Sequence, residues 1–490
     1  SKQAAELGAA IEKVSKSSSG IACLIVCLNE NLTDLQKILR AAEFEAMNFE
    51  SMTGTVSQII EDNKEKLTQA HKELAEQFEK TKQLAQKYSS LQILFDHYSN
   101  LLDREVTKNT APATEQTVVL EGWAKRKDYR RLEKVVSEFS ATSLAKIEPA
   151  EGEMPPIEIA NNKAVTPFET ITRLYGLPSN IDVDPTVFLA PFFALFFGIC
   201  LTDAGYGILL IAVSWWLLRK FQGDKKIIWM FFICSAITIA AGAMTGGWFG
   251  DAFQTLIPQK YEGLYNGVNQ FRTKLMLTDP MENPMVFFGV SLGLGYLQIM
   301  VGILIAFFNN LRQKEYATAI FEHATWFIFL NSLILFGLSK AERIPVGLST
   351  FFGWLSISQA VLIFLFTERK SGIGGRIGGG VFALFSTVFY FGDLLSYARL
   401  MALGMVTGGL GMAINILVKL LMDMPNPIIG YILGALLFVS GHLFNIAMSV
   451  LSSFVHSLRL QFVEFFPKFF VGGGKEFEPL KKNYKHIMVK

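Results

Sequence analysis

The chain has 490 residues and a formal net charge of +2; 51% of its residues are hydrophobic, 18% are charged and 42 are phenylalanines. Several runs exceed the roughly 18 apolar residues that indicate a membrane span, so the composition excludes an ordinary soluble protein. The near-neutral charge gives no indication of nucleic-acid binding, and the four cysteines form no metal-binding or disulfide pattern.

The first 185 residues are soluble in character. Residues 1–14 have a helical pattern, so we expect a helical stub within residues 1–19. Because the pattern is already under way at Ser1, we also expect N-terminal sequence to be missing. Residues 20–150 are expected to form a cytoplasmic α+β lobe. Its predicted strands are residues 21–28, 44–49, 117–122 and 143–148, and its predicted short helices are residues 32–42 and 128–137.

One long helix is predicted within this lobe, at residues 55–105. Apolar residues recur in it at near-heptad intervals among Lys, Glu and Gln, which is typical of a coiled-coil arm. These residues are Leu67, Leu74, Leu84, Leu91, Phe95, Tyr98 and Leu102. Pro155 and Pro156 end the lobe, and residues 151–185 are predicted to link it to the membrane domain.

Residues 186–466 form the predicted membrane domain. Short basic segments at residues 219–226, 309–314, 368–376 and 468–482 mark its cytoplasmic side, so an even number of spans must separate them. The predicted spans are residues 227–250, 285–308, 320–338, 350–366, 378–422 and 428–466. A single span at 186–218 would break this rule, so we expect a hairpin of two short spans that turns at residues 202–207.

The predicted fold is therefore mainly α, with a polytopic membrane domain of about eight spans and a cytoplasmic tail at residues 467–490. Both termini are expected in the cytoplasm. Asp423–Pro427 is the only turn signal between residues 377 and 466. The last two helices are consequently far longer than the roughly 20 residues that cross a bilayer, and they must tilt or extend beyond it.

Arg459 stands near the end of an apolar run of 39 residues, Ile428 to Phe466. A charge at bilayer depth costs about 2.5–3.5 kcal/mol and by default marks a functional site. Polar residues precede it at steps of three and four, which predicts a polar wall on one helix. They are His442, Asn445, Ser449, Ser452 and His456. Snorkelling of Arg459 to the headgroups, and hydrogen-bonded packing of each histidine, are the alternatives.

A second arginine occupies the penultimate helix. Asp393, Ser396 and Arg399 are three residues apart and lie along one ridge, and a glycine-rich stretch at 404–411 follows, which lets another surface approach closely. Two long helices thus each bring one arginine into the membrane behind polar residues. Pairing with a neighbouring helix would equally explain Asp393.

These two helices carry a family resemblance. Leu395–Gly404 and Phe454–Phe466 closely resemble subunit a, also called subunit I, of the V-type and A-type rotary ATPases. Residues 184–207, Leu120–Ala124 and Gly472–Gly474 also resemble it. The resemblance covers about residues 20–480, and its paired arginine motifs are highly specific.

The resemblance implies a stator membrane subunit without a catalytic site. Arg399 and Arg459 would be its essential arginines, because a cation favours the ionised form of a rotor carboxylate and so releases the bound H⁺ or Na⁺. Their counter-charge would lie on another chain. The implied partners are a rotor ring of c/K subunits, peripheral-stalk E/G-type subunits and a central-stalk d/C-type subunit. No bound cofactor is expected, and the implied location is the plasma membrane of a bacterium or archaeon.

The sequence departs from the eukaryotic branch at two positions. Thr407 stands where a histidine is common and Ser449 where a glutamate is common, so the match is to the bacterial or archaeal branch. The half-channel candidates are therefore His442, Asn445, Ser449, Ser452, His456, Asp393, Ser396 and Glu464. Asp203 and Asp251 follow probable helix breaks, where capping is as good an interpretation as ion contact. Glu464 is either a cytoplasmic-side cation ligand or an ordinary interfacial charge.

Two other functions remain open at this point. A secondary transporter with a cytoplasmic regulatory domain would favour inverted repeats and broken helices, and we find no convincing repeat. A membrane scaffold for peripheral stalks fits the N-terminal half but leaves the arginines unexplained. The sequence contains no Walker loop, so we do not expect this chain to hydrolyse nucleotide.

Overall fold

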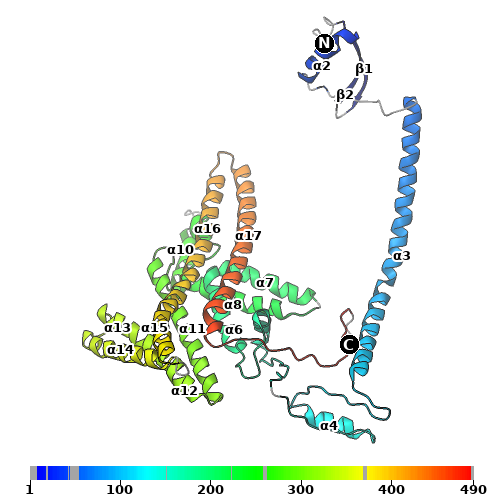
Figure 1. The fold of residues 1–490 in the computed structure, drawn as a ribbon. Helices are drawn as coiled ribbons and strands as arrows, with labels where there is room; N and C mark the ends of the chain where they lie inside the picture. The colour runs from blue at the N-terminus through cyan, green and yellow to red at the C-terminus, as the bar shows by residue number, and fades with distance from the viewer. Residues whose placement is uncertain are drawn as a thin grey trace. The chain divides into compact units, whose positions relative to one another are not determined.

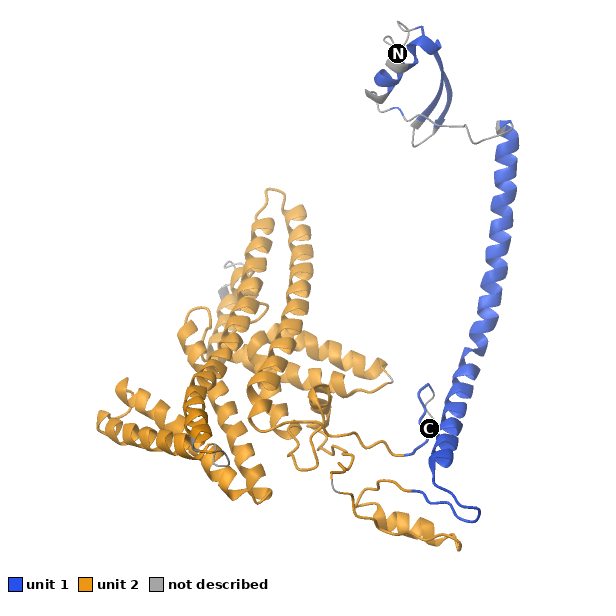
Figure 2. Cartoon of the chain, in the orientation of Figure 1, with its two compact units in different colours: residues 1–120, 480–490 blue, residues 121–479 orange. Residues whose placement is uncertain are grey.

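The computed structural model describes residues 8–17, 20–41, 44, 55–150, 152–221, 223–257, 262–367 and 372–486. The chain divides into two compact units, residues 1–120 with 480–490 and residues 121–479 (Figure 2). The first unit contains a small hairpin and one long helix, and the second contains all the long apolar helices (Figure 1).

The first unit begins with an antiparallel hairpin of β1 (Ala10–Ser17) and β2 (Gly20–Val26), followed by α2 (Leu32–Ala41). The predicted strand at 21–28 and the predicted helix at 32–42 are confirmed. The predicted strand at 44–49 lies outside the described residues apart from Phe44.

The predicted helical stub is wrong where the structure describes it. Residues 10–17 form β1, whose backbone pairs with β2 and places Ile11 opposite Ile25. Helix propensity is worth less than about 1 kcal/mol per residue, so pairing with a neighbouring strand overrides a weak helical pattern.

The predicted long helix is confirmed as α3 (Val56–Thr110), a single helix of 55 residues. A capping box starts it, in which the Thr55 hydroxyl accepts the Gln58 N–H and the Gln58 side chain accepts the Thr55 N–H. The predicted heptad residues, from Leu67 to Leu102, are all more than half exposed in this chain. An exposed row of this spacing is the face that another helix covers in a coiled coil.

Residues 111–150 lack the two predicted strands. The segment 117–122 makes only an isolated bridge between Ala113 and Val118, and no strand forms at 143–148. The predicted helix at 128–137 is confirmed as α4 (Tyr129–Ser137). A single extended segment is not stable without strand neighbours, and the described residues supply none here.

The predicted linker folds in its second half. A 3₁₀ turn (Thr166–Phe168) and α5 (Glu169–Tyr175) follow one another. Phe168 is buried against Phe193, and the Glu169 carboxylate lies 3.0 Å from the Lys226 ammonium. This segment therefore packs directly on the membrane helices.

The apolar half of the chain is helical throughout. Its α-helices are α6 (Thr186–Leu201), α7 (Ala204–Lys220), α8 (Lys226–Thr245), α9 (Ala252–Thr255), α10 (Glu262–Leu275), α11 (Pro284–Arg312), α12 (Tyr316–Thr318), α13 (Thr325–Lys340), α14 (Ser349–Phe366), α15 (Ile373–Ser396), α16 (Ala398–Met422) and α17 (Pro427–Arg459). π-helical turns at Ala319–Ala324 and Leu460–Phe465 precede α13 and follow α17.

Six helical stretches among the described residues are long and apolar enough to cross a membrane. They are residues 226–245, 284–312, 316–340, 346–366, 374–422 and 427–468. Each overlaps one of the six predicted long spans. The chain also breaks at Thr202–Asp203, where the hairpin was predicted, but α6 and α7 have only 16 and 17 residues. The total of eight spans therefore stays a prediction.

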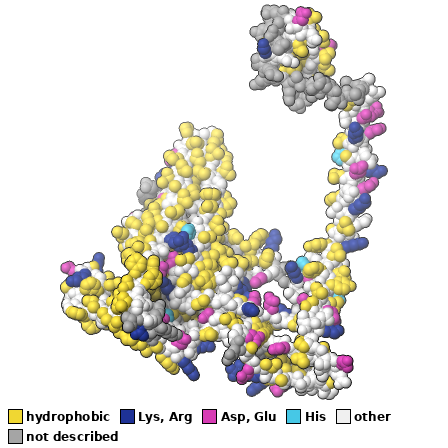
Figure 3. Space-filling view, viewed as in Figure 1, with side chains coloured by type: hydrophobic (Ala, Val, Ile, Leu, Met, Phe, Trp, Pro, Cys, Tyr) yellow, Lys and Arg dark blue, Asp and Glu magenta, His cyan; other side chains and the backbone are white. Residues whose placement is uncertain are grey.

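The last two stretches are the very long helices that the sequence predicts. They have 49 and 42 residues, which corresponds to roughly 70 and 60 Å of helix against a core of about 30 Å. α16 and α17 lie side by side and are joined by the turn at residues 423–426 (Figure 1). Their outer surface is covered by hydrophobic side chains (Figure 3). The first of them is interrupted at Tyr397, between α15 and α16.

The core of this unit is built around α6. One face of α6 packs Phe193 and Phe197 against α8 and the chain end near Phe465, and the other packs Phe196 and Cys200 against α11 and α16. Gly404 allows close contact, because a Cβ there would lie 2.9 Å from the Ile199 carbonyl oxygen. This packing fixes α16 and α17 against the same short helix.

Candidate functional site

Both predicted arginines lie at irregular points of their helices. Arg399 is the second residue of α16, directly after the break at Tyr397, and Arg459 ends α17 directly before the π-helical turn. The two guanidinium groups interact electrostatically with each other. Arg399 is half-buried and Arg459 is exposed in this chain. Breaks and π-turns of this kind are frequent at functional sites.

The predicted polar wall of α17 turns gradually out of the protein. His442, Asn445 and Ser449 are buried, whereas Ser452 and His456 are half-buried. Arg459 follows His442 by 17 residues. At 3.6 residues per turn, this spacing is about 100° short of five full turns, so the two side chains lie on different faces of the helix. The buried polar positions beyond Ser449 are instead Ser453, Ser457, Gln461 and Glu464.

A continuous hydrogen-bond network surrounds His442. Its Nδ1 lies 2.7 Å from the Tyr206 hydroxyl and its Nε2 lies 3.0 Å from Asn415 Oδ1. The Asn415 amide nitrogen donates to the Phe249 carbonyl at 2.8 Å and to Asp251 at 2.9 Å. Because both of these partners are acceptors, the Asn415 oxygen must face His442. The His442 Nε2 is then the donor and Nδ1 accepts from Tyr206.

The network continues toward the arginines. The Asn445 amide nitrogen donates to the Tyr206 hydroxyl oxygen at 2.8 Å and to the Thr407 carbonyl at 3.2 Å. The Ser449 hydroxyl lies 3.2 Å from Asn445 Oδ1, and the Thr407 hydroxyl lies 3.1 Å from Ser449 Oγ. Thr407 and Ser449, the two departures from the eukaryotic pattern, are therefore hydrogen-bonded to each other.

Asp203 and Asp251 both organise the loop after α8. Buried Asp203 accepts the N–H groups of Tyr206 at 3.0 Å, Phe249 at 3.0 Å and Gly250 at 2.7 Å, so it caps α7 and holds the loop. Asp251 accepts from Asn415 and from the Thr255 hydroxyl. Phe249 adopts a φ of 51° between these anchors, which is a strained conformation for a residue other than glycine.

Arg399 and several residues in the last part of the final long helix have unpaired polar atoms. Each member of this group has a buried nitrogen or oxygen without a hydrogen-bond partner among the described residues. The atoms are Arg399 Nη1, Ser453 Oγ, His456 Nδ1, Gln461 Nε2 and Glu464 Oε2. Native proteins pair nearly all buried polar atoms with protein, water or ions, so this cluster is suited to a polar partner.

Asp393 and Ser396 lie in α15, before the break at Tyr397 that separates them from Arg399. The Asp393 carboxylate forms an ion pair of 2.5 Å with Lys468, whose ammonium lies 4.0 Å from the centre of the Tyr390 ring. Ser396 contacts the Glu464 carboxylate and also lies 3.2 Å from the Gly392 carbonyl oxygen. Glu464 lies within electrostatic range of both arginines, and no ion pair between it and either arginine is found among the described residues.

Several residues of this region were not predicted from the sequence. Tyr206, Asn415, Gln298, Tyr397 and Lys468 all hydrogen-bond or pair with the candidates or their immediate neighbours. The available signal was a polar side chain inside an apolar run, which applies to Gln298 and Asn415.

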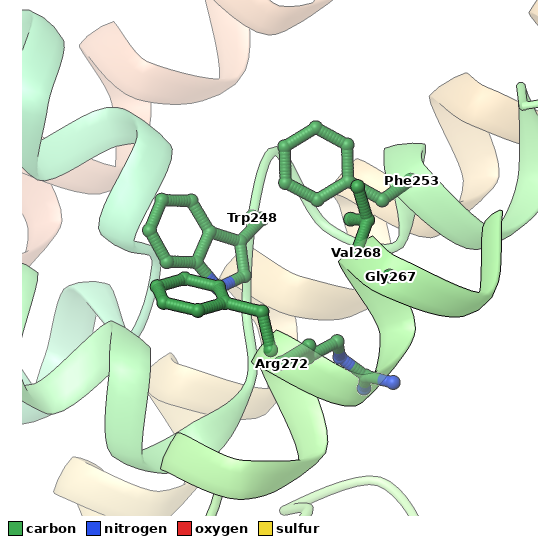
Figure 4. A pocket seen from close by; sticks show the side chains of 6 residues that line it. Trp248, Phe253, Gly267, Val268 and Arg272 are labelled. Carbon is green, nitrogen blue, oxygen red and sulfur yellow. The ribbon is translucent and has the colours of Figure 1, made fainter. Parts of the chain in front are cut away.

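One cleft lies apart from these residues. It has a volume of about 280 Å³ between the loop after α8 and α10, and Trp248, Phe253, Val268, Phe271 and Arg272 line it with Gly267 (Figure 4). Arg272 is held by the Gly246 carbonyl at 2.7 Å and by Asp279 at 3.2 Å. The cleft is aromatic and includes none of the predicted site residues.

Comparison with known proteins gives a consistent result. The model of the V-type ATPase 116kDa subunit family matches residues 9–239 and 396–482, a range that includes both arginines. A-type ATP synthase subunit I of Methanocaldococcus jannaschii is 30% identical and aligns with 94% of this chain and 69% of its own length. The proteins of the same name from Methanothermobacter thermautotrophicus and Pyrococcus horikoshii are 31% and 29% identical; they align with 95% and 93% of this chain and with 67% and 68% of their own lengths.

Proposed function

Because the chain belongs to the V-type ATPase 116kDa subunit family, we propose that it is the membrane stator against which a rotor ring turns. Membership makes it a subunit of a rotary ATPase without a catalytic site of its own. The observation that carries the proposal is the meeting of Arg399 and Arg459 at irregular turns of two very long apolar helices.

The proposed chemistry follows from the charge of this pair. A rotor carboxylate that carries H⁺ or Na⁺ would approach the arginines, which stabilise its ionised form and so release the ion. The same positive charges oppose a direct leak of cations past the ring. Moving one charge against 100 mV requires about 2.3 kcal/mol, which ATP hydrolysis in other subunits would supply.

Two half-channels would carry the ion to and from this point. We propose that the buried residues His442, Asn445 and Ser449 line the one nearer the turn at residues 423–426. The unpaired group with His456 and Glu464, together with Ser452 and Ser396, would line the cytoplasmic one. His442 has both ring nitrogens paired, whereas His456 Nδ1 has no partner among the described residues. His456 is thus the better candidate for contact with the ion.

The remaining proposals concern the assembly. The ring would consist of c/K subunits that each carry a membrane carboxylate, with E/G-type peripheral-stalk and d/C-type central-stalk subunits on the cytoplasmic side. The exposed heptad row of α3 supports a helical partner there. We propose a plasma-membrane location, with both termini in the cytoplasm.

Alanine substitution of the arginines tests this function. Arg399→Ala or Arg459→Ala should abolish ion transport coupled to ATP hydrolysis, because the rotor carboxylate then meets one cation where the site needs two. Transport by the complex in vesicles is the measurement, and co-purification of the ring reports on assembly.

The matched control is Arg219→Ala. Arg219 stacks 3.6 Å above the centre of the Trp215 ring at the end of α7, and its loss should leave transport near normal. Near-normal pumping by both site variants would refute the stator function. A functional dimer of this chain alone, without a ring, would favour the transporter instead.

A further inference from the structure

Three buried residues connect the two arginine-bearing helices through α11. The Tyr397 hydroxyl donates to Gln298 Oε1 at 2.8 Å, and the Gln298 amide nitrogen donates to Gln461 Oε1 at 2.7 Å. All three side chains are fully buried. Tyr397 comes from the break between α15 and α16, Gln298 from the middle of α11, and Gln461 from the π-helical turn after α17.

Gln298 can bond to both neighbours at once. An amide presents one oxygen and one nitrogen, so Gln298 can accept from a phenol and donate to an amide oxygen at the same time. Reversing the Gln298 amide alone would place two oxygens against each other, so the Gln298 and Gln461 amides must be oriented together. Breaking either hydrogen bond would leave buried polar groups unpaired in an apolar interior, which is costly, so the bridge resists separation of its three residues.

The backbone of α11 is fitted to this bridge. Gly295 lies one helical turn before Gln298, and a Cβ at this position would overlap the Tyr397 ring. The ring therefore rests directly on the helix, with its hydroxyl at the level of Gln298. A side chain at residue 295 would push Tyr397 away from its acceptor.

The ends of the bridge lie beside the arginines in the sequence. Tyr397 precedes Arg399 by two residues and Gln461 follows Arg459 by two residues. Both are in the irregular turns that set the direction of the adjacent arginine. Long helices deviate at such turns only where side chains stabilise the deviation. A functional pair must be held within about 0.5 Å of its working geometry, which requires supporting contacts of this kind.

We infer that Gln298 is a positioning residue that fixes the separation of Arg399 and Arg459 by binding Tyr397 and Gln461. This inference rests on the proposed function, because the positions of Arg399 and Arg459 matter only if both act on the rotor carboxylate. It assigns no contact between Gln298 and the transported ion.

α11 offers a matched control. Tyr296, two residues from Gln298, donates through its hydroxyl to Asn331 Oδ1 at 2.7 Å. This hydrogen bond joins α11 to α13 and involves neither arginine-bearing helix. Tyr296→Phe and Tyr397→Phe thus each remove one hydroxyl that donates to a side-chain amide, at two different interfaces.

The test compares Tyr397→Phe, Gln298→Met and Tyr296→Phe in the assembled complex in vesicles. Loss of one buried hydrogen bond in Tyr397→Phe, and of two in Gln298→Met, should lower the number of ions transported per ATP by about fivefold or more. The ion concentration for half-maximal transport should also fall, that is, shift to higher pH or lower Na⁺, since displaced arginines release the ion less readily. Tyr296→Phe should match the unaltered complex in both quantities. The double variant Tyr397→Phe/Gln298→Met should be no worse than the more impaired single variant.

Each outcome decides the inference. If Arg399→Ala and Arg459→Ala abolish transport while Gln298→Met and Tyr397→Phe keep the normal ion ratio and half-maximal concentration, positioning by Gln298 is refuted and the stator function stands. If the arginine variants still pump, both are refuted. Equal impairment by Tyr296→Phe, or a loss of assembled ring without a shift in half-maximal concentration, would show a purely structural role.

Discussion

His442 and Arg459 belong to one polar row in the sequence, yet they have different surroundings in the structure. The row repeats more tightly than an α-helix, so His442 is buried between α7 and α16 while Arg459 reaches the surface. The sequence therefore predicted which residues form the candidate site better than which way they face. The sequence did not identify Tyr206 and Asn415 as members of the site, because their hydrogen-bond partners come from other helices.

Asn415 should be the residue that secures the loop after α8. Asn415→Leu removes its bonds to the Phe249 carbonyl, Asp251 and His442 while keeping a similar volume. We expect amide hydrogen exchange in residues 246–257 to become roughly tenfold faster, since each unpaired buried group costs about 1–3 kcal/mol. Mass spectrometry of the purified protein would measure it.

Asn331→Leu is the corresponding control, because Asn331 is a half-buried asparagine of an apolar helix that bonds instead to Tyr296 and Phe327. It should leave exchange in residues 246–257 unchanged. Equal exchange in this segment for Asn415→Leu and the unaltered protein would show that Asp203 alone holds the loop.

At the scale of elements, long apolar runs defined the helices and polar contacts defined their irregularities. Each predicted long span overlaps a helix of the structure. The interruption at Tyr397 and the π-helical turn after Arg459 were not predicted; residues in both bond to Gln298 in α11, which is remote in the sequence. Both irregularities lie at the arginines, where geometry matters most to the proposed function.

The ion pair of Asp393 and Lys468 should tie the end of the last helix to α15. The two side chains are 23% and 15% exposed, so solvent screens the pair only in part. Asp393→Asn and Lys468→Met should each shorten the thermal inactivation half-life of the complex, with a loss of about 1 kcal/mol. The double variant should lose little more than either single variant. Strictly additive losses would show that the two groups act independently.

At the scale of the whole molecule, the membrane half followed the sequence more closely than the soluble half. Apolar runs and basic loops are local signals, and they located the spans. The strands predicted at 117–122 and 143–148 needed partners that the described residues do not provide. β1 was missed because residues 1–14 have a helical pattern, which its pairing with β2 overrides. The α3 helix was predicted because its heptads are local and long.

The exposed side of α17 around Arg459 should be the surface that meets the ring. Val455 and Val463 lie four residues to either side of Arg459 and are 49% and 55% exposed in this chain. Trp354 on α14 is 68% exposed and serves as a control on a different helix.

Disulfide cross-linking measures this contact most directly. Val455→Cys and Val463→Cys should each form a disulfide with a cysteine placed beside the carboxylate of a ring subunit, and Trp354→Cys should not. Cross-linking from Trp354→Cys, with none from either position beside Arg459, would contradict the account.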